Sequence, residues 1–551
     1  MTFFTKSLIL TILFTIYFVV RSNAQVVFEP TYKTVYGYLS RLAQKGVIDL
    51  NDIVLPLSRA YISNKLDTLS YQSGILTPLE KKELDFYRKE YTLERNIEQN
   101  IELISPYKSV FKTQHGDRFR WGAYQDKQFT INAQPVGGYE GEINENGKLN
   151  HHTWRGIWVY GYLGKNIGYS FDFRDNTEKG ESIDKIKNFT PTTGVISSNS
   201  GDDAIEYSEL KGTISASWKW GVFSVGKDYF NWGYGLGGKI VMSQKAPAFP
   251  LIRLDLSPVK WFRFNYQHIW LNSDVIDSLT IRSTSIAGAN WNQFSYREKL
   301  MAMHSLTFIP TRGMSISVGE SAIYNDGVKI AYLIPIMFFR AIDHYSGGLR
   351  NNGVSNSQVF FQFSSRNLLP KTHFYFTYFI DEIRLKGLFD SSENRDQTAY
   401  TAGISLADFP FNNLSWTVEY SKVRPFAYVN YVTAQDYTSA GYPLGHWIGT
   451  NADQFYAEFL LRLARGFQIK GKFEFIRKGD IGTGYLQQTE IGTPFLWGSV
   501  NRFSNLSLTA QYELTHDLYL KTGYTLKSRH GNDIANDYEK QFFSVGFNYG
   551  F

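Results

Sequence analysis

Apolar and polar residues alternate along the last segment of the chain, Phe543–Phe551. The odd-numbered positions carry aromatic or apolar side chains, and the even-numbered positions carry small or polar ones. Successive side chains of an extended strand point to opposite faces, so this alternation predicts a β-strand with one apolar face. Such a face packs against lipid or against a protein core.

The same period of two recurs over most of the chain. The strand expected from Asn505 to Thr515 shows it clearly, with apolar side chains at its even-numbered positions. Runs of about 10 residues with this alternation have the length that a tilted membrane-spanning strand needs. We count 18 such runs, which begin near residues 128, 154, 166, 205, 221, 249, 259, 299, 314, 356, 371, 397, 413, 453, 467, 500, 517 and 539.

The connections between these runs alternate between two lengths. Every second connection is tight, as at Gly164-Lys165 and Ser257-Pro258, whereas the others are long and rich in Asn, Ser, Gly and Thr, as over 175–204 and 424–452. Short turns at one rim and long loops at the other are typical of outer-membrane barrels. We therefore predict an all-β transmembrane barrel of about 18 antiparallel strands over residues 120–551. A soluble β-sandwich or propeller is the alternative, and it would not separate the loop lengths so regularly.

Residues 25–110 follow a different pattern, with apolar positions at helical spacing of three to four. The segment Thr77-Pro78-Leu79-Glu80 has a hydroxyl for the N-cap, a proline at the first helical position and a glutamate three residues after the cap. We expect about three helices, which form a small bundle on the periplasmic side.

The N-terminus has the features of an export signal. Lys6 precedes an apolar run from Leu8 to Val20, and Ser22-Asn23-Ala24 matches a small-x-small cleavage pattern. As a transmembrane anchor this run is shorter than the ~20 residues that span a bilayer. We expect cleavage near Ala24, removal of residues 1–24 and integration into the outer membrane of a Gram-negative cell. The expected partners are outer-membrane lipids and the barrel assembly machinery, with Tyr549 and Phe551 as its assembly signal.

Composition narrows the chemistry. The chain has no cysteine, so disulfides and thiolate metal sites are excluded. A formal net charge of +6 is too small to favour a nucleic-acid partner. His151-His152 are expected in the first external loop and have no further ligand at useful spacing, and His304-Ser305 point to opposite faces of their strand. We therefore predict no metal, no cofactor and no catalytic residues.

One long connection is apolar, unlike the others, which are rich in polar residues. Residues 331–339, Ala-Tyr-Leu-Ile-Pro-Ile-Met-Phe-Phe, are continuously apolar, and an exposed patch of this kind is a contact site or an aggregation hazard. We predict that this segment folds into the lumen as a plug, with an extra strand above the membrane as the alternative. The candidate plug residues are Tyr332, Pro335, Phe338 and Phe339.

Aromatic and charged residues gather at the ends of the strands that carry the long loops. Flat apolar faces beside hydrogen-bonding charges suit the sugar rings and carboxylates of polysaccharides. An interfacial aromatic girdle is the competing explanation, and we assign half of these residues to it. The candidate polysaccharide-binding residues are Asp228, Trp232, Arg340, Arg424, Tyr428, Tyr437 and His446.

Several of these segments resemble the Wzi-type capsule-assembly family, in a divergent branch with a longer helical N-terminus. The resemblance rests on YGYLSRLAQKGVIDLNDIVLPLSRAYISNKL, GKDYFNWGYGLGGKIVMSQKAPAFP, YLIPIMFFR followed by FIDEI, EYSKVRPFAY and YPLGHWIGTNADQF. Family-like positions in this chain are Asn231-Trp232-Gly233, Ser243, Pro247, Pro250, Arg424, Tyr428, Gly445, His446 and Gly449. Gln244-Lys245 depart from the family pattern, so sugar specificity does not transfer.

The resemblance implies an 18-stranded barrel with a periplasmic helical bundle, acting as a non-enzymatic outer-membrane lectin. Such a protein binds capsular or surface polysaccharide and supports its attachment or assembly at the cell surface. Two alternatives stay open: a channel for small solutes, and a scaffold for a surface-secretion or motility apparatus. In the scaffold, the helical bundle binds a periplasmic partner.

Overall fold

The computed structural model describes residues 26–99, 106–114, 118–286, 289–342, 355–382, 396–479, 493–532 and 536–550. The expected signal segment 1–24 and Phe551 lie outside these residues. Among the described residues, no helix combines the length and the apolar character that a membrane crossing requires.

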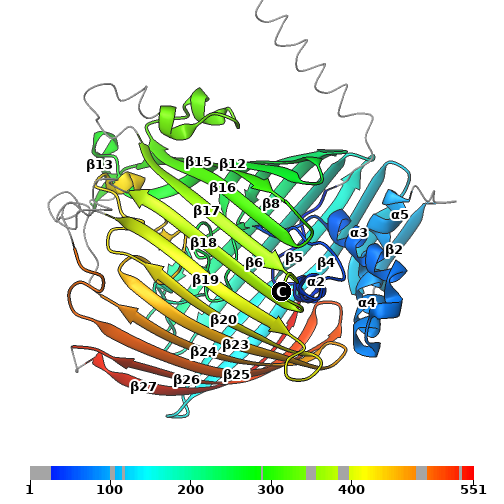
Figure 1. Ribbon diagram of the computed structural model, residues 1–551. Helices are drawn as coiled ribbons and strands as arrows, with labels where there is room; N and C mark the ends of the chain where they lie inside the picture. The colour runs from blue at the N-terminus through cyan, green and yellow to red at the C-terminus, as the bar shows by residue number, and fades with distance from the viewer. Residues whose placement is uncertain are drawn as a thin grey trace, which may run out of the picture.

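A closed barrel of 18 antiparallel strands dominates the structure (Figure 1). Its strands are β4 (Phe129–Asn144), β5 (Leu149–Leu163), β6 (Ile167–Lys179), β8 (Ala204–Trp218), β9 (Gly221–Asp228), β11 (Phe249–Val259), β12 (Phe262–Ile276), β15 (Tyr296–Phe308), β16 (Met314–Asn325), β17 (Ser355–Arg366), β18 (Thr372–Glu382), β19 (Gln397–Ala407), β20 (Leu414–Val423), β23 (Ala452–Ala464), β24 (Phe467–Lys478), β25 (Asn501–Thr515), β26 (Leu518–His530) and β27 (Tyr538–Tyr549). The predicted strand number is confirmed, and each strand begins within a few residues of its expected position.

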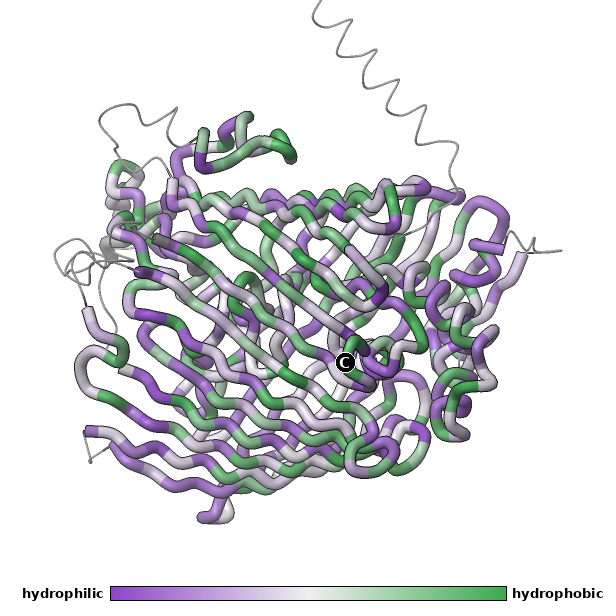
Figure 2. Tube along the Cα trace, viewed as in Figure 1, coloured by the Kyte–Doolittle hydropathy of each residue, from purple (hydrophilic) through white to green (hydrophobic). Residues whose placement is uncertain are grey.

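The wall has an apolar outside and a polar inside. On β27 the outward side chains Phe543, Val545 and Phe547 are about half exposed, whereas buried Gln267 and Gln362 face the lumen. Figure 2 shows the resulting alternation of hydrophilic and hydrophobic residues along the wall strands. This inverted arrangement suits a barrel in a lipid bilayer, because lipid accepts the apolar side chains and the lumen accepts the polar ones.

The two rims differ as predicted. Tight connections such as Trp218 to Gly221 and Ala464 to Phe467 lie at one rim, which we call the turn end. Long connections such as 180–203 and 424–451 lie at the other, the loop end. The first connection at the loop end is an exception, because β4 and β5 are joined by Glu145–Lys148 alone. His151 and His152 therefore lie on β5 and not in a loop.

The N-terminal segment is helical and covers the turn end of the barrel (Figure 1). Its apolar side chains form a core of their own, which includes Leu39, Leu66 and Leu84. The expected capping box is present, because Thr77 and Glu80 exchange side-chain to backbone hydrogen bonds. The helices are α2 (Thr34–Gln44), α3 (Arg59–Tyr71), α4 (Pro78–Glu90) and α5 (Thr92–Glu98), with a short 3-10 turn η1 (Ser73–Ile75).

A hairpin of β2 (Tyr107–Gln114) and β3 (Arg118–Gln125) links the helices to the barrel, and the sequence did not predict it. β3 pairs with the turn-end part of β4, from Thr130 to Ala133, while β27 pairs with the rest of β4, from Gly137 to Asn144. The pairing of β4 with β27 thus closes the barrel. We call this junction the seam, and β3 continues it toward the turn end.

Short strands and 3-10 turns stand in the connections. β1 (Val54–Leu55) of the helical segment pairs with β10 (Asn231–Trp232), which lies inside the barrel. The remaining ones are β7 (Asn199–Ser200), β13 (Arg282–Ile286), β14 (Ala289–Gln293), β21 (Thr438–Ser439), β22 (Tyr442–Pro443), η2 (Ser278–Thr280), η3 (Ile330–Leu333) and η7 (Thr433–Gln435).

Buried ion pairs fix the helical segment to the barrel. Lys33 pairs with Asp517 in the turn between β25 and β26, and Arg41 pairs with Asp408 in the turn after β19. Each of these four side chains is at most 4% exposed. Removing one partner of such a pair strands a charge in a buried site, so these contacts hold the two parts in one relative position.

Candidate functional site

Two connections from the loop end fold into the lumen and fill it. The first lumen loop is 229–248, between β9 and β11, and the second is 424–451, between β20 and β23. Together with inward wall residues such as Ile269 and Met301, they form the largest apolar cluster of the described residues. We call this cluster the lumen core.

Four of the candidate binding residues lie in the lumen core or against it and are not exposed to a ligand. Trp232, Tyr437 and His446 are fully buried, and Tyr428 is 3% exposed. Because their ring faces are covered by neighbouring side chains, a sugar cannot stack on them in this conformation. These four side chains, which the sequence predicted at a polysaccharide site, therefore pack within the lumen loops.

Their polar atoms are used within the plug as well. The Tyr428 hydroxyl donates to the Ile240 carbonyl at 2.6 Å, and the Tyr437 hydroxyl donates to the Val241 carbonyl at 2.8 Å. Burial lowers the pKa of His446 to about 3, so this imidazole stays neutral. The second lumen loop is thereby tied to the first.

Close packing explains a glycine at the contact between the loops. A Cβ on Gly238 would stand 2.5 Å from atoms of the His446 ring. Glu419, on the inner face of β20, accepts hydrogen bonds from the backbone amides of Leu236 and Gly237 at 2.6 and 2.8 Å. The glycine-rich turn is therefore fixed on both sides.

The other two lumen candidates lie apart from each other. Asp228 ends β9 beside Lys211 and Tyr229, at a small cavity next to the helical segment. Arg424 begins the second lumen loop, where its carbonyl accepts a hydrogen bond from Thr450 and its guanidinium lies 3.5 Å from Asp396. The structure therefore does not bring the candidate binding residues together as one exposed sugar site.

The predicted plug segment lies outside the lumen. Tyr332 and Phe339 are buried, but against the outward face of the wall, where they contact Tyr324 and His304. Phe338 is 57% exposed, Pro335 is half-buried and Arg340 is exposed at the end of the segment. The prediction was wrong about the side of the wall. The apolar character of a loop segment predicts that it is buried, but it does not say whether it packs against the inner or the outer face of the barrel.

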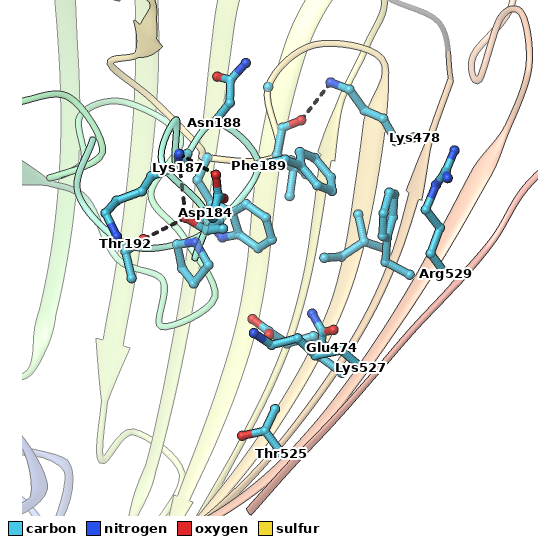
Figure 3. A pocket seen from close by; sticks show the side chains of 18 of the residues that line it. Asp184, Lys187, Asn188, Phe189, Thr192, Glu474, Lys478, Thr525, Lys527 and Arg529 are labelled. Atoms are coloured by element: carbon cyan, nitrogen blue, oxygen red, sulfur yellow. Dashed lines mark hydrogen bonds between the residues drawn. The ribbon is translucent and has the colours of Figure 1, made fainter. Parts of the chain in front are cut away.

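Above the lumen core, a cavity of about 1100 Å³ lies between the second lumen loop, the connection 180–203 and the inner wall. We call that connection the cavity loop. Figure 3 shows Lys187, Asn188 and Phe189 of the cavity loop on one side, and Lys478, Lys527 and Arg529 of the wall beyond them. The wall strands that line it are β4 to β6 and β24 to β27.

Aromatic side chains line the part of the cavity nearest the lumen core. The Phe189 ring lies 5.3 Å from Trp447 and 4.9 Å from Phe503, measured between ring centroids. Trp447 is fixed by a 2.7 Å hydrogen bond from its indole nitrogen to the Gly237 carbonyl. Only Tyr428, of the candidate binding residues, also borders this cavity.

Charged residues of both signs line the cavity, and they include Glu140, Glu142 and Asp184. Lys187 pairs with Glu178 at 2.8 Å, and Lys472 pairs with Glu474 at 3.1 Å. In contrast, Lys527 and Lys540 are register partners on β26 and β27, so two cations face each other across adjacent strands. Like charges in this position destabilise a sheet.

These two lysines have aromatic neighbours but no ion pair within the described chain. The Lys527 amine lies 4.8 Å from the centre of the Phe542 ring, and the Lys540 amine lies 5.2 Å from that of Tyr538. Arg529 stands beside them and donates at 2.9 Å to the side-chain oxygen of Asn501. The three cations form a basic patch on the inner wall, which an anion would stabilise.

Sequence reasoning missed this basic patch. The pattern is weak here, because Lys527, Arg529 and Lys540 occupy inward positions whose outward neighbours include the polar residues Ser528, Glu539 and Gln541. Their convergence depends on the register between β26 and β27, which spacing alone did not give. Among the described residues, no group of three or more His, Asp or Glu side chains is arranged to hold a metal ion.

Comparison with known proteins adds three results. The family profile described as Capsule assembly protein Wzi matches residues 108–542. The structure of Wzi from Escherichia coli, described as an outer membrane protein involved in group 1 capsule assembly and as a carbohydrate-binding β-barrel, has a TM-score of 0.56 and 14% identity, covering 96% of this chain and 100% of that one. No curated protein sequence matches the chain.

Other solved barrels are less similar. OprD from Pseudomonas aeruginosa has a TM-score of 0.42 and 11% identity, covering 76% of this chain and 94% of that one. OccAB2 from Acinetobacter baumannii has a TM-score of 0.40 and 10% identity, covering 76% and 98%. The match to the family profile extends over most of the 18-stranded barrel, and the chain is therefore an integral outer-membrane protein that belongs to the Capsule assembly protein Wzi family.

Proposed function

We propose that this protein is a non-enzymatic lectin that binds capsular or surface polysaccharide in the cavity at the loop end, and so supports its assembly at the cell surface. The basic patch carries this proposal, because Lys527 and Lys540 face each other without an ion pair in the described chain. An acidic sugar would bring a carboxylate into direct contact with these two amines, which form no ion pair among the described residues, while the rings of Phe189 and Phe503 supply apolar surface for sugar faces.

The lumen core supports a lectin over a solute channel. Trp232, Met301 and Phe360 lie in one fully buried cluster that spans from the lumen loops to the wall. A ligand at the loop end would therefore rest on this core and would not pass through it. The scaffold alternative would instead use the helical segment, whose buried charges are already paired with the barrel.

The test is direct binding of glycan to the purified full-length protein in detergent. We expect the double variant Lys527→Gln/Lys540→Gln to bind an acidic polysaccharide such as polygalacturonate at least about tenfold more weakly, since a charge-assisted hydrogen bond contributes about 1.5–3 kcal/mol. Binding of neutral dextran of equal length should change little. Raised salt should weaken binding of the acidic glycan by the wild type.

Lys148→Gln is the matched control, because Lys148 also lies at the loop end but pairs with Glu181 outside the cavity. It should bind like the wild type. Equal binding of the acidic glycan by the double variant and the wild type would exclude the basic patch as the site. Passage of small sugars into liposomes that contain the protein would favour the channel.

A further inference from the structure

Residues 330–342 form a strap against the outward face of β12, β15 and β16. Figure 1 shows this segment outside the barrel wall, beside β15. The Tyr332 ring stacks on Tyr324 with centroids 4.4 Å apart, and the Tyr266 hydroxyl donates to the Tyr332 carbonyl at 2.7 Å. Tyr324 and Tyr266 have the outward orientation, because their register partners alternate with residues of the lumen core.

The wall beneath the strap is polar where its neighbours are apolar. Cross-strand pairing places seven outward residues in one row around the barrel: Phe223, Leu254, Tyr266, His304, Glu320, Val359 and Ile380. The row is apolar at both ends and polar at its three central positions. Polar side chains on the lipid face of a barrel cost free energy, so an uncovered cluster here would destabilise the protein in a bilayer.

The strap covers this polar cluster and satisfies part of it. His304 and Glu320 lie 3.2 Å apart, and the backbone amide of Phe339 donates to the Glu320 carboxylate at 2.7 Å. The Phe339 ring lies over the His304 ring, with centroids 4.6 Å apart. Phe339 is fully buried and Glu320 is 4% exposed.

The outward side of the strap is apolar from Ile330 to Phe338, before exposed Arg340, and this apolar part continues the surface of the wall. Ile336 is 83% exposed and Phe338 is 57% exposed, whereas the uncovered wall beside the strap presents Val318 and Phe361 at 47% and 39%. The strap therefore presents exposed apolar side chains, as the lipid-facing strands do. Since Glu320 lies midway along β16, the contact with Phe339 sets the strap beside the wall and not above its rim.

We propose that the strap lies within the bilayer, with Ile336 and Phe338 among the acyl chains of the outer-membrane lipids and with the polar cluster shielded beneath it. The strap then replaces lipid over this sector of the wall. Its partner is the hydrocarbon of the membrane, not a ligand in the lumen, so this proposal does not depend on the polysaccharide site.

The chain contains no cysteine, so a single introduced cysteine can carry a spin label at a chosen position. Ile336→Cys and Phe338→Cys would be labelled in the full-length protein and reconstituted into phosphatidylcholine vesicles. Oxygen concentrates in hydrocarbon, whereas a charged or hydrated nickel complex stays in water. We expect both strap labels to be accessible to oxygen and protected from nickel.

Two matched positions calibrate the measurement. Phe543→Cys, on the outward face of β27, reports a lipid-facing wall position, and Leu279→Cys, 92% exposed in the connection after β12, reports an aqueous one. Strap labels that respond like position 543 support the proposal. Nickel access equal to that at position 279 would overturn it, and so would protection from both reagents, because a protein would then cover the strap. Ile336 and Phe338 are exposed, so these substitutions should leave the fold intact.

Discussion

The turn end of the barrel and the middle of its lumen are closed by different kinds of contact. At the turn end the helical segment is held to the barrel by buried charges, such as Lys33 paired with Asp517 and Arg41 paired with Asp408. In the middle, the lumen core consists of apolar side chains, with backbone carbonyls as the main hydrogen-bond acceptors. The difference teaches that each buried charge needs its own partner and so fixes where the helical segment sits, whereas apolar packing fills a space through many contacts, to which Ile53 and Val54 of the helical segment also contribute.

The largest effect is expected from removal of a buried charge in the helical segment at the turn end. Arg59→Ala leaves the buried carboxylates of Glu29, Glu90 and Glu94 without their shared cation, and removal of one partner of a buried pair costs about 3–5 kcal/mol. We expect the helical segment to become sensitive to trypsin while the barrel stays intact. Limited proteolysis of the detergent-purified protein measures this. The control is Arg88→Ala, since Arg88 pairs with Asp67 in a more exposed position; equal sensitivity of the two variants would contradict the comparison.

A smaller effect is expected in the lumen core. Ile240 is fully buried in the first lumen loop, and truncation of a buried aliphatic side chain to alanine costs about 2–4 kcal/mol through lost burial and a cavity. We expect Ile240→Ala to loosen the lumen loops and leave the helical segment as protease-resistant as in the wild type. Hydrogen exchange followed along the chain measures both regions at once. Faster exchange in α3 and α4 would show that the two closures are coupled.

The smallest effect is the dependence of stability on pH at the turn end. His516 lies in the turn after β25, stacks on Phe86 with centroids 3.7 Å apart and contacts the Phe86 carbonyl at 2.9 Å. Burial lowers the pKa of His516 from 6.5 to about 4. Its contribution to stability is therefore complete above pH 6.5 and is lost as the pH falls toward 4, because the unfolded imidazole binds a proton that the folded one does not.

His516→Gln sharpens this pH prediction, since a glutamine amide can donate to the same carbonyl but takes up no proton in this range. We expect the thermal stability of the helical segment to fall less steeply between pH 6.5 and 4 in the variant than in the wild type. The lumen loops, where His446 stays neutral down to lower pH, should show no change in this window. Identical pH profiles of the two proteins would exclude His516 as a contributor.

Period-two patterning predicted most of the barrel because lipid and lumen impose opposite demands on alternate residues. It placed β5 five residues late, because His151 and His152 resemble loop residues, although the polar lumen accepts His152 beside Asn176. It missed β2 and β3, although β3 carries the alternation, with Arg118 and Arg120 buried and Phe119 and Trp121 exposed. Capping chemistry at Thr77 was reliable, since it depends on neighbouring residues only.

The candidate site was harder to predict than the fold. The aromatic residues of the lumen loops were identified, but exposure decides whether an aromatic side chain binds sugar or fills a core, and exposure depends on how loops fold back. Lys527 and Lys540 come together through strand register, and the strap lies outside the wall because of contacts with His304 and Glu320. Loop exposure, strand register and the contacts of the strap each depend on segments that are far apart in the sequence.

The seam has a consequence for how the cylinder keeps its geometry. β4 bonds to β3 near the turn end and to β27 beyond it, so the same edge is shared by two neighbours placed end to end. A slide of β27 toward the turn end would push it into the space that β3 occupies. The hairpin thus acts as a mechanical stop that sets the stagger of the closing strand, and with it the tilt and diameter of the whole cylinder.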